Sequence, residues 1–196
     1  METPEGPVVR VKTRLELPDR LGAVRARLGR FRMGYRVPPG LYAAGNPGRD
    51  APVLVSANYK LSFDALRSRL GGLDAWILVL DTRGINVWCA AGKGTFGTAE
   101  IVKRVREQVL RRVVAHRTLV VPQLGAPGVQ AHAVKRDTGF TVVFGPVYAR
   151  DLPVFLARGM QAAPGMRRVR FGLKERAVVV PMEAAQTWKA LLWYVL

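Results

Sequence analysis

The stretch Ala75-Trp-Ile-Leu-Val-Leu80 is apolar at every position. This pattern is typical of a strand covered on both faces, because a strand with one face in water alternates apolar and polar residues. Further short apolar runs are also predicted to be strands: residues 52–57, 118–121, 141–144 and 177–180. Amphipathic segments between or after them are predicted to be helices: residues 62–70, 98–115, a short helix ending near Arg136, 152–157, and a segment from Glu183 onward.

Strands that alternate with helices at this spacing indicate right-handed βαβ units. We therefore expect an α/β fold with a Rossmann-like, mostly parallel sheet of about five strands and helices on both faces. Ligands of such sheets bind beyond the carboxyl ends of the strands, so the loops at that edge are the first place to look for a site.

Composition limits the classes of protein and of site. Of the 196 residues, 49% are hydrophobic and 23% are charged, which is the balance of a globular chain and not of a disordered one. A single cysteine excludes an intrachain disulfide and a Cys-rich zinc or iron–sulfur site within this chain. Only two histidines are present, which argues against a His-based metal cage. This cysteine usage favours a reducing compartment.

The charge is unusual, because 31 Lys and Arg against 14 Asp and Glu give a formal net charge of +17. Such an excess favours a polyanionic partner, either nucleic acid or the anionic face of a membrane. The start of the chain is too polar for a signal peptide, and no stretch reaches the roughly 18 apolar residues of a spanning helix. The chain ends in the apolar run Leu191–Leu196, which suggests a domain cut near a membrane boundary.

The predicted domain organisation has three parts. Residues 1–50 form a basic extension that packs on the core, with a helix over Asp19–Phe31 and a turn-rich loop over residues 37–50. Residues 51–185 form the α/β domain. Residues 186–196 begin a C-terminal helix.

The segment after the strand at residues 75–80 is longer than the roughly 2–6 residues of an ordinary strand-to-helix loop. It contains Gly92-Lys-Gly-Thr-Phe-Gly97, which matches G-x-G-x-x-G and opens the helix at Thr98. The motif does not follow its strand directly, and no acidic residue stands about twenty positions further on, so dinucleotide binding is weakly indicated. Phosphate binding and a flexible helix entry both remain open. The Walker A pattern is absent.

Cys89 lies in the same segment. A lone cysteine is most often a small buried hydrophobic residue. Its place in a ligand-side loop, beside Lys93 and near a helix start, favours instead a thiolate that acts as a nucleophile or a metal ligand. Both alternatives remain open from the residues alone. Three other loops at this edge are rich in small residues and suit a large flat or nucleotide-like ligand, although tight turns explain each one equally well: residues 58–60, 122–128 and 145–148.

Several blocks of the chain resemble the corrinoid protein of microbial mercury methylation. They are PGLYAAGNP, VLVSANYKLSFDALR, GLDAWILVLDTRGINVWCAAGKG, PQLGAPGVQAH, TGFTVVFGPVYARDLP and MRRVRF, with NVWCAAGKGTFGT matching the cap-helix signature. The chain resembles more distantly the large subunit of the corrinoid iron–sulfur protein of the acetyl-CoA pathway. The resemblance implies a cobalamin or related corrinoid at the loop edge, with Cys89, on a cap helix, as the lower ligand of its cobalt.

The residues expected to bind the cofactor come from the four loops. They are Asn58, Tyr59, Asn86, Val87, Trp88, Cys89, Ala90, Ala91, Gly92, Lys93, Gly94, Thr95, Gly97, Thr98, Gln123, Leu124, Gly125, Ala126, Gly145, Pro146 and Val147. Asn86, Trp88 and Lys93 are expected to position the cap helix or polarise the ligand.

The resemblance implies a corrinoid-dependent methyltransferase, in which a methyl-cobalt(III) corrinoid delivers methyl to Hg(II) held by thiolates. Its implied partners are a ferredoxin-like electron donor and a methyl-donor methyltransferase, and its implied place is the cytoplasmic side of the cell membrane. One alternative is a corrinoid methyl carrier for another acceptor, as in the acetyl-CoA pathway. A second alternative, a basic nucleic-acid-binding domain, is disfavoured, because the basic residues are spread without clustered aromatics or a recognition motif.

Overall fold

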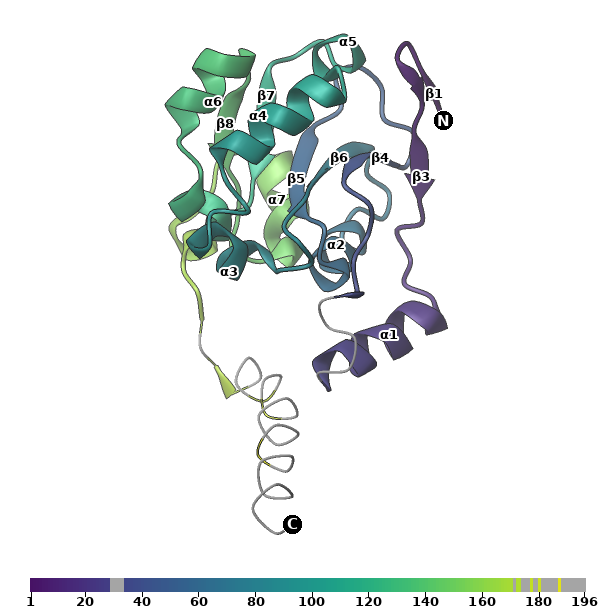
Figure 1. Cartoon of the computed structure of the whole chain (residues 1–196), viewed down its shortest axis with the longest axis vertical. Helices are drawn as coiled ribbons and strands as arrows, with labels where there is room; N and C mark the ends of the chain where they lie inside the picture. The colour runs from purple at the N-terminus through teal and green to yellow at the C-terminus, as the bar shows by residue number, and fades with distance from the viewer. Residues whose placement is uncertain (29–33, 171, 174–176, 178–179, 181–186, 188–196) are drawn as a thin grey trace.

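The computed structural model describes residues 1–28, 34–170, 172, 173, 177, 180 and 187. Within them the chain forms a six-stranded sheet with helices on both faces (Figure 1). This confirms the predicted α/β, Rossmann-like architecture, with one strand more than expected. The strands of the sheet are β3 (Val9–Val11), β4 (Gly40–Ala44), β5 (Val53–Ala57), β6 (Ala75–Leu80), β7 (Thr118–Val121) and β8 (Thr141–Phe144). A small antiparallel pair, β1 (Glu2–Thr3) and β2 (Gly6–Pro7), precedes them.

The strand order is β3-β4-β6-β5-β7-β8. The last four strands of this order run parallel, while β4 pairs antiparallel with β6 and parallel with β3. The chain leaves β5 for β6 on one side and later returns to place β7 on the other side of β5. The carboxyl ends of β5 and β7 therefore form the switch point of the sheet, where open α/β sheets open a crevice for ligands.

Alternate residues of the central strands supply two cores. Trp76, Leu78 and Leu80 of β6 face a core that also holds Phe96 and Ile101, and all five side chains are buried. Ile77 and Val79 face the other core. The first core is covered by α3 (Val87–Gly92), α4 (Thr98–Glu107), α5 (Leu110–Val113) and α6 (Ala131–Thr138). The second is covered by α2 (Lys60–Arg67) and α7 (Leu152–Ala157). The short 3-10 helices are η2 (Gln123–Gly128), η3 (Ala149–Asp151) and η4 (Pro164–Arg167).

The predicted loop over residues 37–50 is wrong, because Gly40–Ala44 is the strand β4 in the interior of the sheet. The strand has only five residues and is flanked by prolines and glycines, which are typical of turns. The local sequence therefore does not indicate a strand. The segment before residue 51 thus contributes β3 and β4 to the sheet, and the division of the chain at residue 50 stays a prediction.

Three predicted helical or strand segments also need correction. The helix predicted over residues 98–115 is broken at Val109, whose φ of 44° separates α4 from α5. The helix predicted over Asp19–Phe31 is α1 (Leu17–Arg27), and the end of the predicted range lies outside the described residues. Of the predicted strand at 177–180, the two described residues are helical and do not join the sheet. The helix predicted from Glu183 lies outside the described residues except for Thr187, which is helical.

Buried charges attach α1 to the sheet domain. Asp19 of α1 accepts from Lys60 at 2.6 Å and from Arg67 at 2.8 Å, and both cations also contact Asp64. Burial alone would raise the pKa of Asp19, but hydrogen bonds from Lys60, the Glu16 amide and Arg67 outweigh it and hold that pKa well below its ordinary value. The charged form of Asp19 therefore stabilises the fold.

We expect Asp19→Asn to lower the free energy of unfolding by about 2 kcal/mol at pH 7, because it leaves two partly buried cations with a weaker partner. The folded-state pKa of Asp19 is depressed, so its contribution is complete above about pH 4 and declines as the pH falls. Urea unfolding should show the difference between the unmodified protein and Asp19→Asn shrinking by about 1 kcal/mol at pH 3. An unchanged difference would show that the charge of Asp19 is not what stabilises α1.

Candidate functional site

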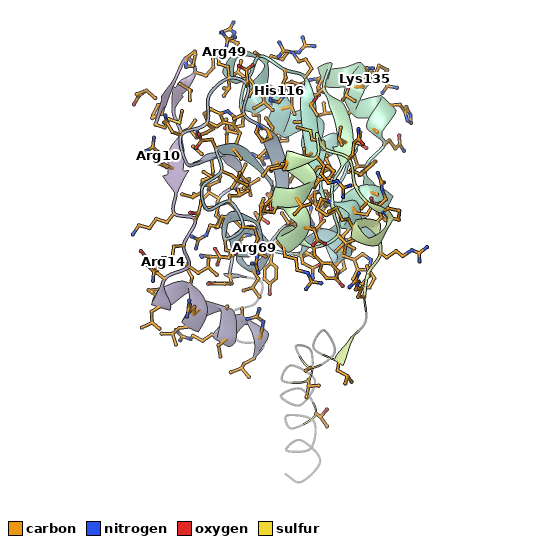
Figure 2. The ribbon with its side chains drawn as sticks, turned by 180° about the vertical axis from the view of Figure 1, so that it is seen from behind. Arg10, Arg14, Arg49, Arg69, His116 and Lys135 are labelled. Carbon is orange, nitrogen blue, oxygen red and sulfur yellow. The ribbon has the colours of Figure 1, made fainter. Side chains whose placement is uncertain are left out.

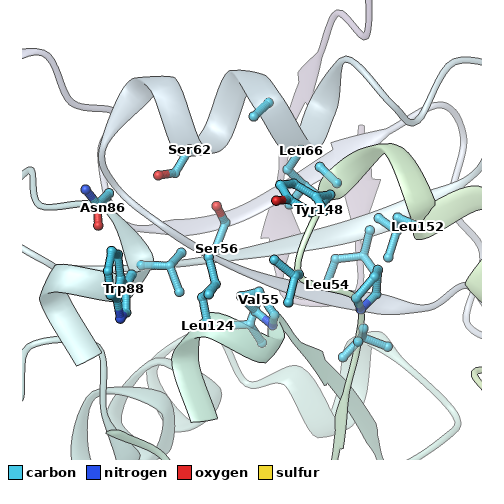
Figure 3. Close-up of a pocket in the computed structure, with 18 residues that line it drawn as sticks. Leu54, Val55, Ser56, Ser62, Leu66, Asn86, Trp88, Leu124, Tyr148 and Leu152 are labelled. Carbon is cyan, nitrogen blue, oxygen red and sulfur yellow. The ribbon is translucent and has the colours of Figure 1, made fainter. Parts of the chain in front are cut away.

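A cavity of about 410 Å³ lies at the switch point, beyond the carboxyl ends of β5 and β7 (Figure 3). One wall is the sheet, another is α2, and the remainder comes from α3, η2, the loop after β8 and the start of α7. Most of its lining is apolar. The lining residues are Leu54, Val55, Ser56, Ser62, Ala65, Leu66, Asn86, Val87, Trp88, Val120, Pro122, Leu124, Gly145, Pro146, Val147, Tyr148, Ala149 and Leu152. A largely apolar cavity with few polar groups is typical of a site for an organic ligand.

The polar groups of the cavity sit at separate points of its wall. Ser56 comes from β5 and is buried, while Ser62 comes from α2 (Figure 3). Tyr148 lies on the loop after β8, and its hydroxyl accepts from the Arg170 amide at 2.8 Å and donates to the Arg170 carbonyl at 2.9 Å. These two bonds fix the Tyr148 ring at the wall. Because the rest of the lining is mostly apolar, the hydroxyls of Ser56 and Ser62 are the groups placed to orient a bound ligand by hydrogen bonds.

The cap helix α3 stands at the rim of this cavity. Asn86 caps it, and its side-chain oxygen accepts from the Cys89 amide at 2.9 Å. Ala90 and Ala91 on its inner face are buried in the core. Cys89 is exposed and Trp88 is 60% exposed. The structure therefore rejects the alternative of Cys89 as a small buried hydrophobic residue, and its thiol is accessible next to residues that line the cavity.

A buried asparagine holds the loop that leads into α3. The Asn58 side-chain oxygen accepts from the Thr82 amide, the Thr82 hydroxyl and the Gly84 amide at 3.1, 2.8 and 3.0 Å. Its amide group donates to Asp81 at 3.0 Å. Asn58 is 1% exposed, and the neighbouring Tyr59 is also buried. Neither residue lines the cavity, so the structure gives both predicted cofactor contacts a supporting position beneath the site.

The glycine-rich motif divides into two parts. Gly92, Lys93 and Gly94 lie exposed at the end of α3. Phe96 is fully buried under Gly125, Gly97 packs against the Gly128 carbonyl, and the Thr98 hydroxyl accepts from the Gln130 amide at 2.8 Å. The second half of the motif thus packs the start of α4 against η2. This half of the motif is therefore a packed helix entry, and not the flexible one expected from its glycines.

The cavity brings together only some of the predicted cofactor residues. Those that line it are Asn86, Val87, Trp88, Leu124, Gly145, Pro146 and Val147. Gln123 instead accepts from Arg167 at 3.3 Å, and Gly125 and Ala126 are not in the lining. The strand, α2 and α7 residues of the lining were missed, because positions such as Ser56 and Leu66 belong to ordinary strand and helix patterns. To predict that these residues line a cavity, one must know that β5 and β7 are neighbours in the sheet, and no local sequence pattern shows that order.

Comparison with known proteins identifies the family. The family model described as CO dehydrogenase/acetyl-CoA synthase delta subunit matches residues 31–156, more than half of the chain. The chain belongs to this family. Proteins of the family bind a corrinoid cofactor. The match runs from before β4 into α7, and so contains the cap helix and every residue that lines the cavity.

Curated relatives agree on the type of complex. An acetyl-CoA decarbonylase/synthase complex subunit gamma of Archaeoglobus fulgidus is 36% identical over 118 residues, which cover 59% of this chain and 25% of the relative. The corresponding subunit of Methanopyrus kandleri is 38% identical over 129 residues, covering 62% and 26%. The chain thus spans about a quarter of the length of these relatives. The family description names a delta subunit, whereas the relatives are gamma subunits. The comparisons therefore establish the family but do not assign the chain to one type of subunit.

These findings correct the resemblance to the mercury-methylation protein. The family match and the curated relatives name the acetyl-CoA decarbonylase/synthase system, which supports the resemblance first judged more distant. The blocks quoted for that resemblance lie mostly within residues 31–156, the segment that the family model matches. Mercury methylation has no support here.

The residues present fit a corrinoid. The apolar cavity suits the flat, apolar end of a nucleotide-like tail, and Cys89 is exposed on the helix beside it. Among the residues that the structure describes, no group of three or more His, Cys, Asp or Glu could hold a metal ion. A corrin ring supplies most of the ligands of its own cobalt, so a corrinoid needs no such group from the chain.

Proposed function

We propose that the chain is the corrinoid-binding part of a methyl carrier. This was the first alternative raised by the sequence, a corrinoid protein that carries a methyl group to another acceptor, as in the acetyl-CoA pathway. The observation that carries the proposal is the apolar cavity at the switch point with an accessible thiol at its rim. When bound, a corrinoid supplies a cobalt that accepts and gives up a methyl group. The family membership supports the cofactor, and the acceptor of the methyl group is left to experiment.

Each part of the site has a role in this proposal. Cys89 would offer its sulfur to the cobalt, because it is exposed on α3 directly after the cavity-lining Asn86, Val87 and Trp88. Asn86 keeps the first turn of α3 in place through the Cys89 amide. The cavity would take the nucleotide tail, and Ser56 and Ser62 would supply its hydrogen-bonding groups. The remaining predicted cofactor residues would lie around this contact or support it.

The partners of the proposed carrier follow from its own composition and from its relatives. One cysteine cannot hold an iron–sulfur cluster, so we propose that low-potential electrons come from a separate ferredoxin-like protein. A methyltransferase would supply the methyl group. The relatives carry the name of a multi-subunit complex, which supports protein partners in general.

Reconstitution with cobalamin tests the proposal. We expect the protein to retain cobalamin on desalting, with an absorption spectrum of the form whose own base is displaced from cobalt. Ser62→Phe should weaken binding about tenfold to a hundredfold, because its ring would fill the cavity. Ser68→Phe is the matched control, since Ser68 ends the same helix but does not line the cavity.

Complete loss of cobalamin on desalting would contradict the proposed cofactor. Equal binding by the unmodified protein and Ser62→Phe would show that cobalamin binds elsewhere. Thermal unfolding of both variants verifies that each retains its fold.

A further inference from the structure

Helix α1 turns an apolar stripe towards solvent. Leu17, Leu21, Val24 and Leu28 follow one another at intervals of four, three and four residues, which places them on one face of the helix. Their side chains are between 46% and 68% exposed. Within the described part of the chain, four large apolar side chains gathered on one helical face are a feature that folding of the α/β domain does not explain.

The opposite face of α1 is fixed to the protein. Ala26 is buried, and Asp19 forms ion pairs with Lys60 and Arg67 of α2. Gly22 lies so close to Tyr35 that a Cβ there would stand 2.3 Å from the Tyr35 hydroxyl. The helix is therefore held with its apolar stripe outward, and it cannot rotate to bury the stripe without breaking these contacts.

Arginines border the stripe. At about 100° per residue, Arg20 and Arg27 lie on one side of it and Arg25 on the other. All three are exposed, and Arg14, also exposed, lies beside the start of the helix (Figure 2). The acidic residues of α1 and its cap are engaged, since Glu16 contacts Lys12 at 2.6 Å and Asp19 faces the protein. The stripe thus has positive charge along the margin of Arg20 and Arg27 and beside the start of the helix.

We propose that α1 docks the protein on an anionic lipid surface, lying in the plane of the bilayer with its apolar stripe among the acyl chains and its arginines at the phosphates. The charge pattern favours lipid over a protein partner, because arginines beside an apolar stripe match the phosphates above the acyl chains of an anionic bilayer. The stripe itself consists of Leu and Val, without the Trp or Tyr anchors that concentrate the binding energy of many protein interfaces. No described helix is long and apolar enough to cross a membrane. Helix α1 has 11 residues, fewer than the roughly 20 of a spanning helix, and would therefore lie at the surface.

Docking through α1 would orient the candidate site. Lys60, which pairs with Asp19, begins α2 just beyond the carboxyl end of β5. Helix α1 therefore lies at the same edge of the sheet as the cavity, and α1, α2 and α3 lie towards the same end of the sheet in Figure 1. The proposal does not depend on what binds in the cavity.

Vesicle flotation of the whole chain tests the proposal. We expect binding to vesicles of 70% phosphatidylcholine and 30% phosphatidylglycerol at 0.1 M salt, and none to phosphatidylcholine alone. Arg20→Gln with Arg27→Gln should weaken binding about 30-fold, because each basic residue near such a surface contributes about fivefold. Leu21→Gln with Val24→Gln should weaken it about tenfold or more, since two apolar side chains no longer enter the bilayer.

Matched controls come from exposed residues elsewhere. Val154→Gln replaces a 51% exposed valine on α7, and Arg112→Gln removes an exposed arginine of α5. Both should bind vesicles as the unmodified protein does. The replaced side chains of α1 are exposed, so the variants should keep the unmodified melting temperature.

The proposal is overturned if the unmodified chain does not float with the anionic vesicles, or if it binds phosphatidylcholine equally well. Unchanged binding by the Leu21 and Val24 double variant would also overturn it. If sedimentation instead reveals a dimer that this double variant dissociates, and vesicles do not bind, the stripe is a protein interface and the lipid proposal fails.

Discussion

Cobalamin is expected to protect Cys89 from alkylation. Cys89 is the sole cysteine of the chain and is exposed on α3, so iodoacetamide should modify it readily in the protein without cofactor. If the sulfur becomes a cobalt ligand, its lone pair is engaged, and the alkylation rate should fall about tenfold or more on reconstitution. Mass spectrometry of the intact protein measures this directly, because no other thiol contributes.

A displaced cysteine separates ligation from simple shielding of the protein surface. In Cys89→Ala with Val154→Cys, the single thiol stands at an exposed position of α7 that does not itself line the cavity. Its alkylation rate should not change when cobalamin is added. Equal protection of both thiols would mean that cobalamin lowers reactivity in a general way, and Cys89 would lose its proposed role.

Absorption spectra of Cys89 variants with bound cobalamin test the same proposal, that the Cys89 sulfur is a ligand of the cobalt. Cys89→Ala should still retain cobalamin through the cavity but lose the sulfur-to-cobalt charge-transfer absorption. Cys89→His replaces a soft anionic donor by a neutral one, and should bind cobalamin with a different spectrum. If Cys89→Ala gives the spectrum of the unmodified protein, the thiol does not reach the cobalt, and binding through the cavity stands without it.

The central parallel strands were predictable because each is a short run of consecutive apolar residues, a signal that can be read from the strand's own sequence. Ala75–Leu80 is apolar throughout, and the structure buries all six residues as β6. The same signal located β5, β7 and β8 to within a residue. Strand β4 was missed because Gly40 begins it at a φ of 151° and prolines precede it, so its local pattern is that of a turn. Pairing with β6, a contact distant in sequence, is what makes it a strand.

The site was predictable only in part, for a different reason. Loop residues such as Asn86 and Leu124 could be assigned to the ligand edge, because strand ends meet there whatever the order of the strands. The position of the cavity depends on β5 and β7 being neighbours, and no local pattern encodes that order. Asn58 was placed in the site for its position after β5, yet its side chain is consumed by four hydrogen bonds to the next loop.

Close packing between α3 and η2 positions the cap helix, and Gly128 is the residue on which this packing depends. A Cβ at Gly128 would stand 2.2 Å from the Phe96 carbonyl oxygen and 3.2 Å from both the Ala91 Cα and the Ala91 carbonyl oxygen. These are backbone atoms, so no side-chain rotation can relieve the overlap. An added methyl group must push α3 and the start of α4 away from η2.

We expect Gly128→Ala to lower the free energy of unfolding by about 2–3 kcal/mol, in the range of overpacked core substitutions. The melting temperature should fall by about 8 °C, given roughly 2–4 °C for each kcal/mol in a chain of this size. Cobalamin binding should weaken as well, because Asn86, Val87 and Trp88 would move with α3. Gly71→Ala is the control, since its Cβ would meet nothing within 4 Å and its backbone does not require glycine. Equal melting temperatures for the two variants would show that α3 and η2 separate without cost, and that the cap helix is held by its buried alanines alone.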